Sequence, residues 1–93
     1  MAVQITHVRF NGYNRSEETI VRYQWFNPSD GKFGDNDKPS MVDFIDNKKG
    51  EAYVGSGTSK VAVGVVHPAP GDPYLRTRAD GIWTNNLINL PTF

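Results

Sequence analysis

The residues best suited to bind a ligand lie in one stretch near the carboxyl end of the sequence. The pair Asp80-Gly81 favours a type I′ turn, because both residues tolerate the positive φ angles that this turn requires. With these two residues as the loop, the flanking strands pair Ala79 with Ile82, Arg78 with Trp83, Thr77 with Thr84 and Arg76 with Asn85. Side chains alternate along a strand, so five polar or aromatic residues then share one face. We call it the hairpin face, and it consists of Tyr74, Arg76, Arg78, Trp83 and Asn85.

The chemistry of the hairpin face is that of an anion and ring binder. Its two arginines offer bidentate donors for phosphate or carboxylate, and Tyr74 and Trp83 offer flat surfaces for a ring. This combination suits a small nucleotide-like ligand or a stretch of single-stranded nucleic acid. The structural alternative is that Arg78 only stacks on Trp83 as a cation–π pair, worth ~0.5–1 kcal/mol when exposed.

The opposite face of the same hairpin is smoother and more apolar, so we expect it to lie against the core. Its members are Leu75, Thr77, Ala79, Ile82 and Thr84.

Two other patterns could carry chemistry, and each has a simpler interpretation. The run Gly55-Ser-Gly-Thr-Ser-Lys60 is typical of a phosphate-binding loop, but a valine-rich strand follows it instead of the required helix, which favours a turn. The cluster of Asp30, Asp35 and Asp37 lacks the spacing and the glycine of a calcium loop.

No nucleophile or base has a partner at a useful spacing. His7 and His67 each stand alone, which favours structural roles over metal ligation. The serines fall in predicted turns or at a helix cap, and none occupies a strained strand-to-helix elbow. We therefore expect no enzymatic activity, no cofactor and no metal.

Composition narrows the class of protein. A chain of 93 residues predicts one domain, residues 1–93, with a core small enough that a second subunit would stabilise it, so we expect a homo-oligomer. Ten basic residues balance ten acidic ones, which disfavours a nucleic-acid partner without excluding it. There is no cysteine, and no segment has the length or character of a signal peptide or a membrane span. A soluble, cytoplasmic protein with no membrane partner is the expectation.

The hairpin must be positioned by elements that the apolar pattern predicts upstream. We expect four strands, one helix, a long polar loop and a closing 3₁₀ segment: strands over residues 3–10, 19–26, 52–55 and 60–67, a helix over residues 40–49, a loop over residues 31–38 and the 3₁₀ segment around residues 87–90. Ser40 is the expected helix cap, Gly50 the expected left-handed terminator and Phe44 the main core residue of the helix. A shift of the apolar positions in the first strand predicts a β-bulge. The fold class is therefore α+β: a curved antiparallel sheet of five to six strands, in the order β-β-α-β-β-β, packed on one helix. The alternative is that this sheet curls into a partly closed barrel.

Several runs of this chain resemble one family of small bacterial proteins. They are Gln4-Ile-Thr-His-Val-Arg9, Ile20-Val-Arg22, Tyr74-Leu-Arg-Thr-x-Ala-Asp80 and Asn86-Leu-Ile-x-Leu-Pro91. The family is domain of unknown function 3892. Two departures are Asn85, where an aspartate is expected, and a longer polar insert around residues 31–38. The resemblance implies a stand-alone domain and carries no activity or site.

Three hypotheses for function follow, all based on the hairpin face. The first is a non-enzymatic module that binds a small anionic, nucleotide-like ligand. The second is a protein-interaction or assembly module, and the third is a single-stranded nucleic-acid binder that uses the same residues.

Overall fold

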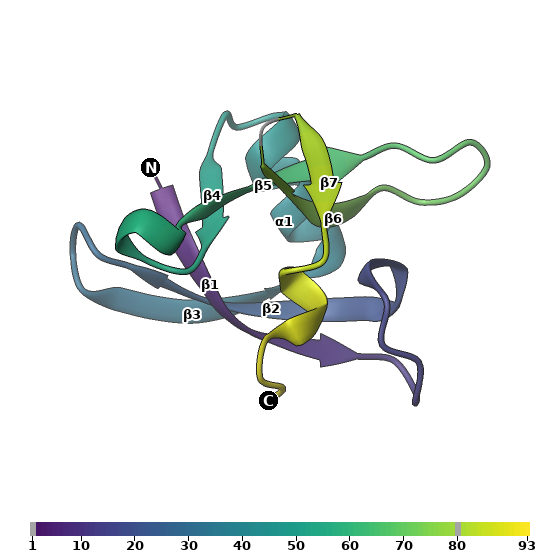
Figure 1. The fold of residues 1–93 in the computed structure, drawn as a ribbon, viewed down its shortest axis with the longest axis horizontal. Helices are drawn as coiled ribbons and strands as arrows, with labels where there is room; N and C mark the ends of the chain where they lie inside the picture. The colour runs from purple at the N-terminus through teal and green to yellow at the C-terminus, as the bar shows by residue number, and fades with distance from the viewer. Residues whose placement is uncertain (1, 80) are drawn as a thin grey trace.

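A single mixed sheet carries the whole fold. A computed structural model describes residues 2–79 and 81–93, and its strands follow the spatial order β3-β2-β1-β4-β5-β6-β7. The elements in chain order are β1 (Ala2–Phe10), η1 (Glu17–Thr19), β2 (Ile20–Asn27), β3 (Lys32–Asp37), α1 (Lys38–Asp46), β4 (Glu51–Val54), η2 (Gly57–Ser59), β5 (Val61–Val66), β6 (Tyr74–Ala79), β7 (Ile82–Thr84) and η3 (Leu87–Asn89). In Figure 1, β2 and β3 lie in the lower part of the view and β4 to β7 in the upper part, with α1 behind the upper strands, while β1 runs from beside β4 down to β2. The α+β class is confirmed, but the sheet has seven strands and does not close into a barrel.

The strand that the sequence did not predict is β3. Residues 31–38 were expected to form a loop, yet six of them pair with β2 in unbroken register from Asn27–Lys32 to Arg22–Asp37. A tight turn starts this pairing, with the Gly31 N–H donating to the Asn27 carbonyl at 2.9 Å. The strand is polar because it lies at the edge of the sheet, where five of its six residues are exposed to solvent.

The sheet is not wholly antiparallel, because β1 and β4 run parallel. Their pairing covers only Ala2–Gln4 of β1, against Glu51–Tyr53 of β4. Beyond it, β1 shows the predicted bulge as a register shift between Ile5 and His7. The edge of β1 that pairs with β4 is then covered by the chain's last segment, where the Val8 N–H donates to the Pro91 carbonyl at 3.0 Å.

The helix α1 begins and ends differently from the prediction. Asp37 and not Ser40 is the N-cap, since the Asp37 carboxylate accepts from the Ser40 N–H at 2.9 Å. At the other end the left-handed residue is Lys49, with φ 58°, and not Gly50. Met41 is the buried residue of the helix, whereas Phe44 is half-buried and packs at the margin of the core.

The core fills the space between the sheet and α1, and residues from both halves of the sheet enter it. Its members are Val3, Ile5, Val8, Ile20, Tyr23, Met41, Ala52, Val54, Val63, Leu75 and Leu87. Leu87 comes from the predicted 3₁₀ segment and is fully buried.

The predicted hairpin register is confirmed, with Thr77–Thr84, Arg78–Trp83 and Ala79–Ile82 as partners. Asp80 of the predicted turn lies outside the described residues. Leu75 and Thr77 are buried as expected, but Ala79 and Ile82 are exposed, because the hairpin tip extends past the core.

The two outer strands leave free edges, and both carry exposed apolar side chains. Phe33 of β3 is 75% exposed and Ile82 of β7 is 69% exposed. Because a free edge with an apolar side chain favours pairing between copies, we predict a homodimer in solution. Light scattering at micromolar concentration should give twice the mass of one chain, and Phe33→Asp should lower it toward a single chain. A single-chain mass for the unmodified protein at all concentrations would contradict the prediction.

Candidate functional site

The hairpin face assembles as predicted, but most of its polar groups bind one another. Arg78 stacks over Trp83, with its guanidinium carbon 5.1 Å from the ring centroid. Arg76 donates through Nη2 to the Asn85 side-chain oxygen at 2.9 Å and through Nε to the Thr84 carbonyl at 3.1 Å. Tyr74 is half-buried at the far end of β6. The structure thus brings the five predicted residues onto one hairpin, with Arg76 already occupied.

Arg76 also compensates a buried carboxylate. The Glu17 side chain is only 11% exposed, and its Oε1 atom lies 3.4 Å from Arg76 Nε. This Oε1 atom is buried and accepts no hydrogen bond from the described residues, so the nearby guanidinium charge is its main compensation. Arg76 therefore ties β6 to η1 and is a structural residue before it is a ligand donor.

The outer part of the hairpin face continues across neighbouring strands. Strand register places Trp83, Arg78, Ala62 and Tyr53 in one row from β7 to β4. A second cation–ring contact lies in this row, with Lys60 Nζ 4.1 Å from the Tyr53 ring centroid. The predicted face is thus the end of a longer surface of stacked cations and rings.

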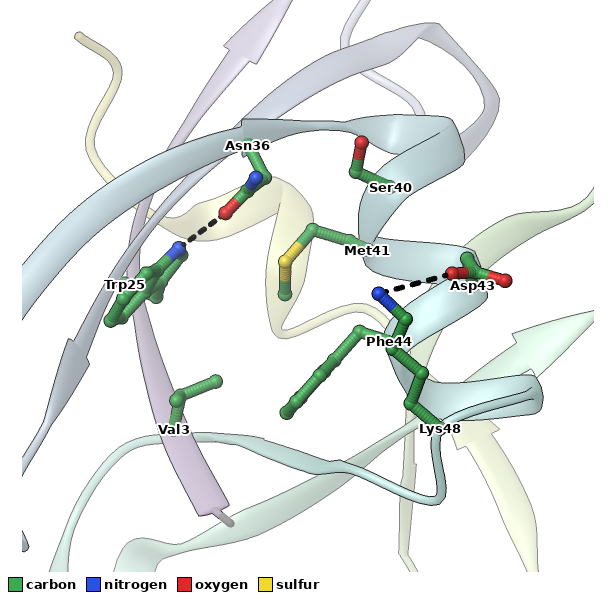
Figure 2. Close-up of a pocket in the computed structure, with 8 residues that line it drawn as sticks. All are labelled: Val3, Trp25, Asn36, Ser40, Met41, Asp43, Phe44 and Lys48. Atoms are coloured by element: carbon green, nitrogen blue, oxygen red, sulfur yellow. Dashed lines mark hydrogen bonds and ion pairs between the residues drawn. The ribbon is translucent and has the colours of Figure 1, made fainter.

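A separate hollow lies between α1 and the strands β1, β2 and β3, and we call it the α1 cavity. Its volume is about 280 Å³. Four apolar or aromatic side chains form its walls: Val3, Trp25, Met41 and Phe44. Figure 2 shows Trp25 of β2 and Phe44 of α1 on opposite sides of the hollow, with Met41 and Val3 between them.

Polar groups gather at one side of the α1 cavity. They are Asn36, Ser40, Asp43 and Lys48. Asn36 Oδ1 accepts the Trp25 indole N–H at 2.9 Å, which holds the indole in place and leaves the Asn36 amide nitrogen as a donor. Lys48 Nζ lies 3.7 Å from Asp43 Oδ2, and the Lys48 side chain is 71% exposed. The arrangement can hold a flat apolar group between two rings and a polar or anionic group beside Lys48.

Two glycines allow the aromatic walls of the α1 cavity to sit where they do. Gly34 of β3 lies under Trp25, and a Cβ there would come within 3.0 Å of the indole. Gly50 lies against Phe44, and an added Cβ would overlap the phenyl ring. A side chain at either position would therefore press on one of the two aromatic walls.

Two side chains that support the fold, Tyr23 and Asp37, have shifted pKa values. Burial raises the pKa of the Tyr23 hydroxyl, which lies in the core. Hydrogen bonds from the Ser40 hydroxyl and from its N–H lower the pKa of Asp37, the helix cap.

The other residues that the sequence singled out make separate local contacts and do not form a common site. Asp35 pairs with Arg22, Asp37 caps α1, and the Asp30 carboxylate accepts from the Lys32 N–H at 2.9 Å. His7 Nδ1 lies 3.0 Å from the Thr6 hydroxyl oxygen at the β1 bulge, and His67 Nε2 lies 3.1 Å from Asp46 Oδ2. Residues 55–60 form the predicted turn around η2.

Residues 2–79 and 81–93 contain neither a candidate group of metal ligands nor a membrane-spanning helix. Within these ranges no three or more His, Asp or Glu side chains group as metal ligands, and no helix is long and apolar enough to cross a membrane.

Comparison with known proteins gives one match. Residues 4–91 match the family model described as "Protein of unknown function (DUF3892)". The chain belongs to this family. No curated protein and no solved structure matches it. The description of DUF3892 names no activity, so assignment of a site in this DUF3892 chain depends on geometry.

The sequence did not predict the α1 cavity, because its lining residues are far apart along the chain and strand β3, which carries Asn36, was not expected. Trp25, Asn36 and Phe44 come from three elements, and Asn36 was assigned to a loop. The one available signal was the aromatic spacing in β2, which predicted that Trp25 and Tyr23 share a face.

The two arginines of the hairpin face should differ in their effect on stability. In this DUF3892 chain Arg76→Ala removes charge-assisted hydrogen bonds and leaves Glu17 buried, so we expect a loss of about 1.5–3 kcal/mol in the free energy of unfolding. Arg78→Ala removes one exposed cation–π contact and should cost about 0.5–1 kcal/mol. Urea denaturation of both variants measures the difference, and equal losses would show that Arg76 does not compensate Glu17.

Proposed function

We propose that this protein is a non-enzymatic binding module that takes a small ring-bearing molecule into the α1 cavity. The observation that carries the proposal is the pair of opposed aromatic side chains, Trp25 and Phe44, with a hollow of about 280 Å³ beside them. Ligand sites are typically concave and largely apolar, with a few placed polar groups. The α1 cavity has this composition.

The size of the hollow limits the ligand. Pockets that hold drug-sized molecules span roughly 300–1,000 Å³, so the α1 cavity suits a single ring system and not a whole nucleotide. The two aromatic walls come from β2 and α1, and the Trp25–Asn36 hydrogen bond fixes one of them in advance. A preformed wall lowers the ordering cost of binding.

The polar side of the cavity favours an anionic substituent on the ring. Lys48 is largely exposed and only loosely paired with Asp43, so its ammonium group can turn toward a ligand carboxylate. The Asp43 carboxylate is already engaged by the Asn47 side-chain amide at 2.6 Å. The expected ligand class is therefore a small aromatic carboxylate or a similar anionic ring.

The hairpin face is the second candidate, for an extended partner. The row of Trp83, Arg78 and Tyr53 with its two stacked cations supports an interaction surface for a single-stranded nucleic acid or a protein chain. A small anionic ligand is disfavoured on the hairpin face, because Arg76 already pairs with Glu17.

The two candidates can be separated with one spectrum, because the chain has two tryptophans and each marks one site. In a ¹⁵N-labelled sample titrated with benzoate and indole-2-carboxylate, the Trp25 indole N–H signal should shift while the Trp83 signal stays. Trp83→Phe assigns the signals. A shift confined to Trp83 would favour the hairpin face, and no shift of Trp25 at saturating ligand would refute the cavity proposal.

Matched variants test the chemistry of the site. Gly50→Ala should abolish the Trp25 shift, because the added methyl group would overlap the Phe44 ring and force this wall of the cavity to move. Lys48→Gln should weaken benzoate binding a few-fold and leave neutral benzamide unaffected, as expected for an exposed charge contact. Lys49→Gln, the neighbouring exposed lysine, is the control and should change neither.

A further inference from the structure

A second hollow lies at the opposite end of β1, where the chain's last residues return to the sheet. It is a shallow cleft with a volume of about 340 Å³, and we call it the terminal cleft. Its side chains are Arg9, Phe10, Tyr13, Arg15, Thr92 and Phe93. The pairing of Val8 with Thr92 brings these residues together from β1, the following loop and the last segment.

Both arginines of the terminal cleft are held in place by stacking and by carbonyl groups. The Arg9 guanidinium lies over the Phe93 ring and that of Arg15 over the Phe10 ring, each 4.6 Å from the centroid. Arg15 Nη2 donates to the carbonyls of Ile88 and Leu90 at 2.8 and 3.3 Å. Arg9 Nε donates to the main-chain oxygen of Phe93 at 2.9 Å.

These bonds leave donors free on both groups. A guanidinium has five N–H donors, so the terminal nitrogens of Arg9 and the Nη1 and Nε of Arg15 can still bind a ligand. Within the described residues, no Asp or Glu side chain lies within ion-pair distance of either one. Arg22 and Arg76, by contrast, pair with Asp35 and Glu17. Apart from the main-chain oxygen of Phe93 that Arg9 binds, the cleft thus concentrates positive charge that no acidic side chain among the described residues offsets.

A fully exposed aromatic ring, that of Tyr13, lines the same cleft as these two arginines. Tyr13 is the most exposed large apolar side chain described, at 105% of its reference area. It follows Gly12, whose φ of 84° turns the chain sharply at this point. A ring presented to solvent next to two arginines is the arrangement that stacks a flat ligand group while the guanidinium groups hold an anion.

We propose that the terminal cleft binds a phosphate ester that carries a flat ring, of which a mononucleotide is the simplest. The phosphate would accept from Arg9 and Arg15, and the ring would stack on Tyr13. This chemistry was expected on the hairpin face, but there Arg76 is occupied. The inference is independent of the α1 cavity, which is lined by other residues.

Titration of the ¹⁵N-labelled protein with AMP tests the proposal. Millimolar AMP should shift the amide signals of Gly12, Tyr13 and Thr92, and the indole signals of Trp25 and Trp83 should not move. Adenosine, which lacks the phosphate, should bind about tenfold more weakly or worse. Absence of AMP binding, or shifts confined to the Trp83 indole signal, would overturn the proposal without bearing on the α1 cavity. Shifts confined to the Trp25 indole signal would overturn it and assign AMP binding to the α1 cavity instead.

Variants test separately which residues bind the phosphate of AMP and which bind its ring. Arg9→Gln and Arg15→Gln should each lower AMP affinity about tenfold or more, whereas Arg78→Gln removes an equal charge from the hairpin face and should have no effect. Tyr13→Ala should weaken AMP and leave pyrophosphate binding unchanged. Because Arg15 also holds two carbonyl groups, Arg9→Gln and Tyr13→Ala decide the outcome if Arg15→Gln does not fold. Unchanged AMP affinity in both of these, or an equal loss in Arg78→Gln, would refute the site.

Discussion

The two different pairings of β1 are the constraint on which the rest of the structure depends. Its first three residues pair in parallel with β4, and this short contact joins β2 and β3 to the β4–β7 half of the sheet. After the bulge at Thr6, the same side of β1 accepts the last segment of the chain through Val8. The bulge separates the two pairings, because an extra residue bends a strand and increases its twist.

Each half of β1 supports one of the two hollows. Val3, in the half that pairs with β4, forms a wall of the α1 cavity, and Arg9 and Phe10, at the other end, line the terminal cleft. The two hollows differ in chemistry because their surroundings differ. The first lies under α1 and is walled by rings, whereas the second lies at the sheet's end and is walled by guanidinium groups. The hairpin face lies across β6 and β7, and there Glu17 of η1 occupies one of the two arginines.

The sequence predicted best where local rules decide. The turn residues Asp80-Gly81 and the strand alternation correctly predicted the register that stacks Arg78 on Trp83. The edge strand β3 was missed because its residues are polar and its stability comes from pairing with β2, which no local pattern reveals. The α1 cavity and the occupation of Arg76 by Glu17 were missed for a related reason, since both depend on contacts between distant segments. At the start of α1, Asp37 and Ser40 were both possible caps. Asp37 precedes Pro39 and can reach the Ser40 N–H, so it caps the helix instead of Ser40.

The most direct test of this account is amide hydrogen exchange at Val8. Its N–H donates to Pro91, so it reports whether the last segment covers the second half of β1. We predict that the Val8 amide exchanges as slowly as the amide of Tyr23 in the neighbouring strand, because both would then open only with the sheet. Rapid exchange at Val8 with continued protection of Tyr23 would show that the last segment is not docked, and would contradict the double pairing of β1.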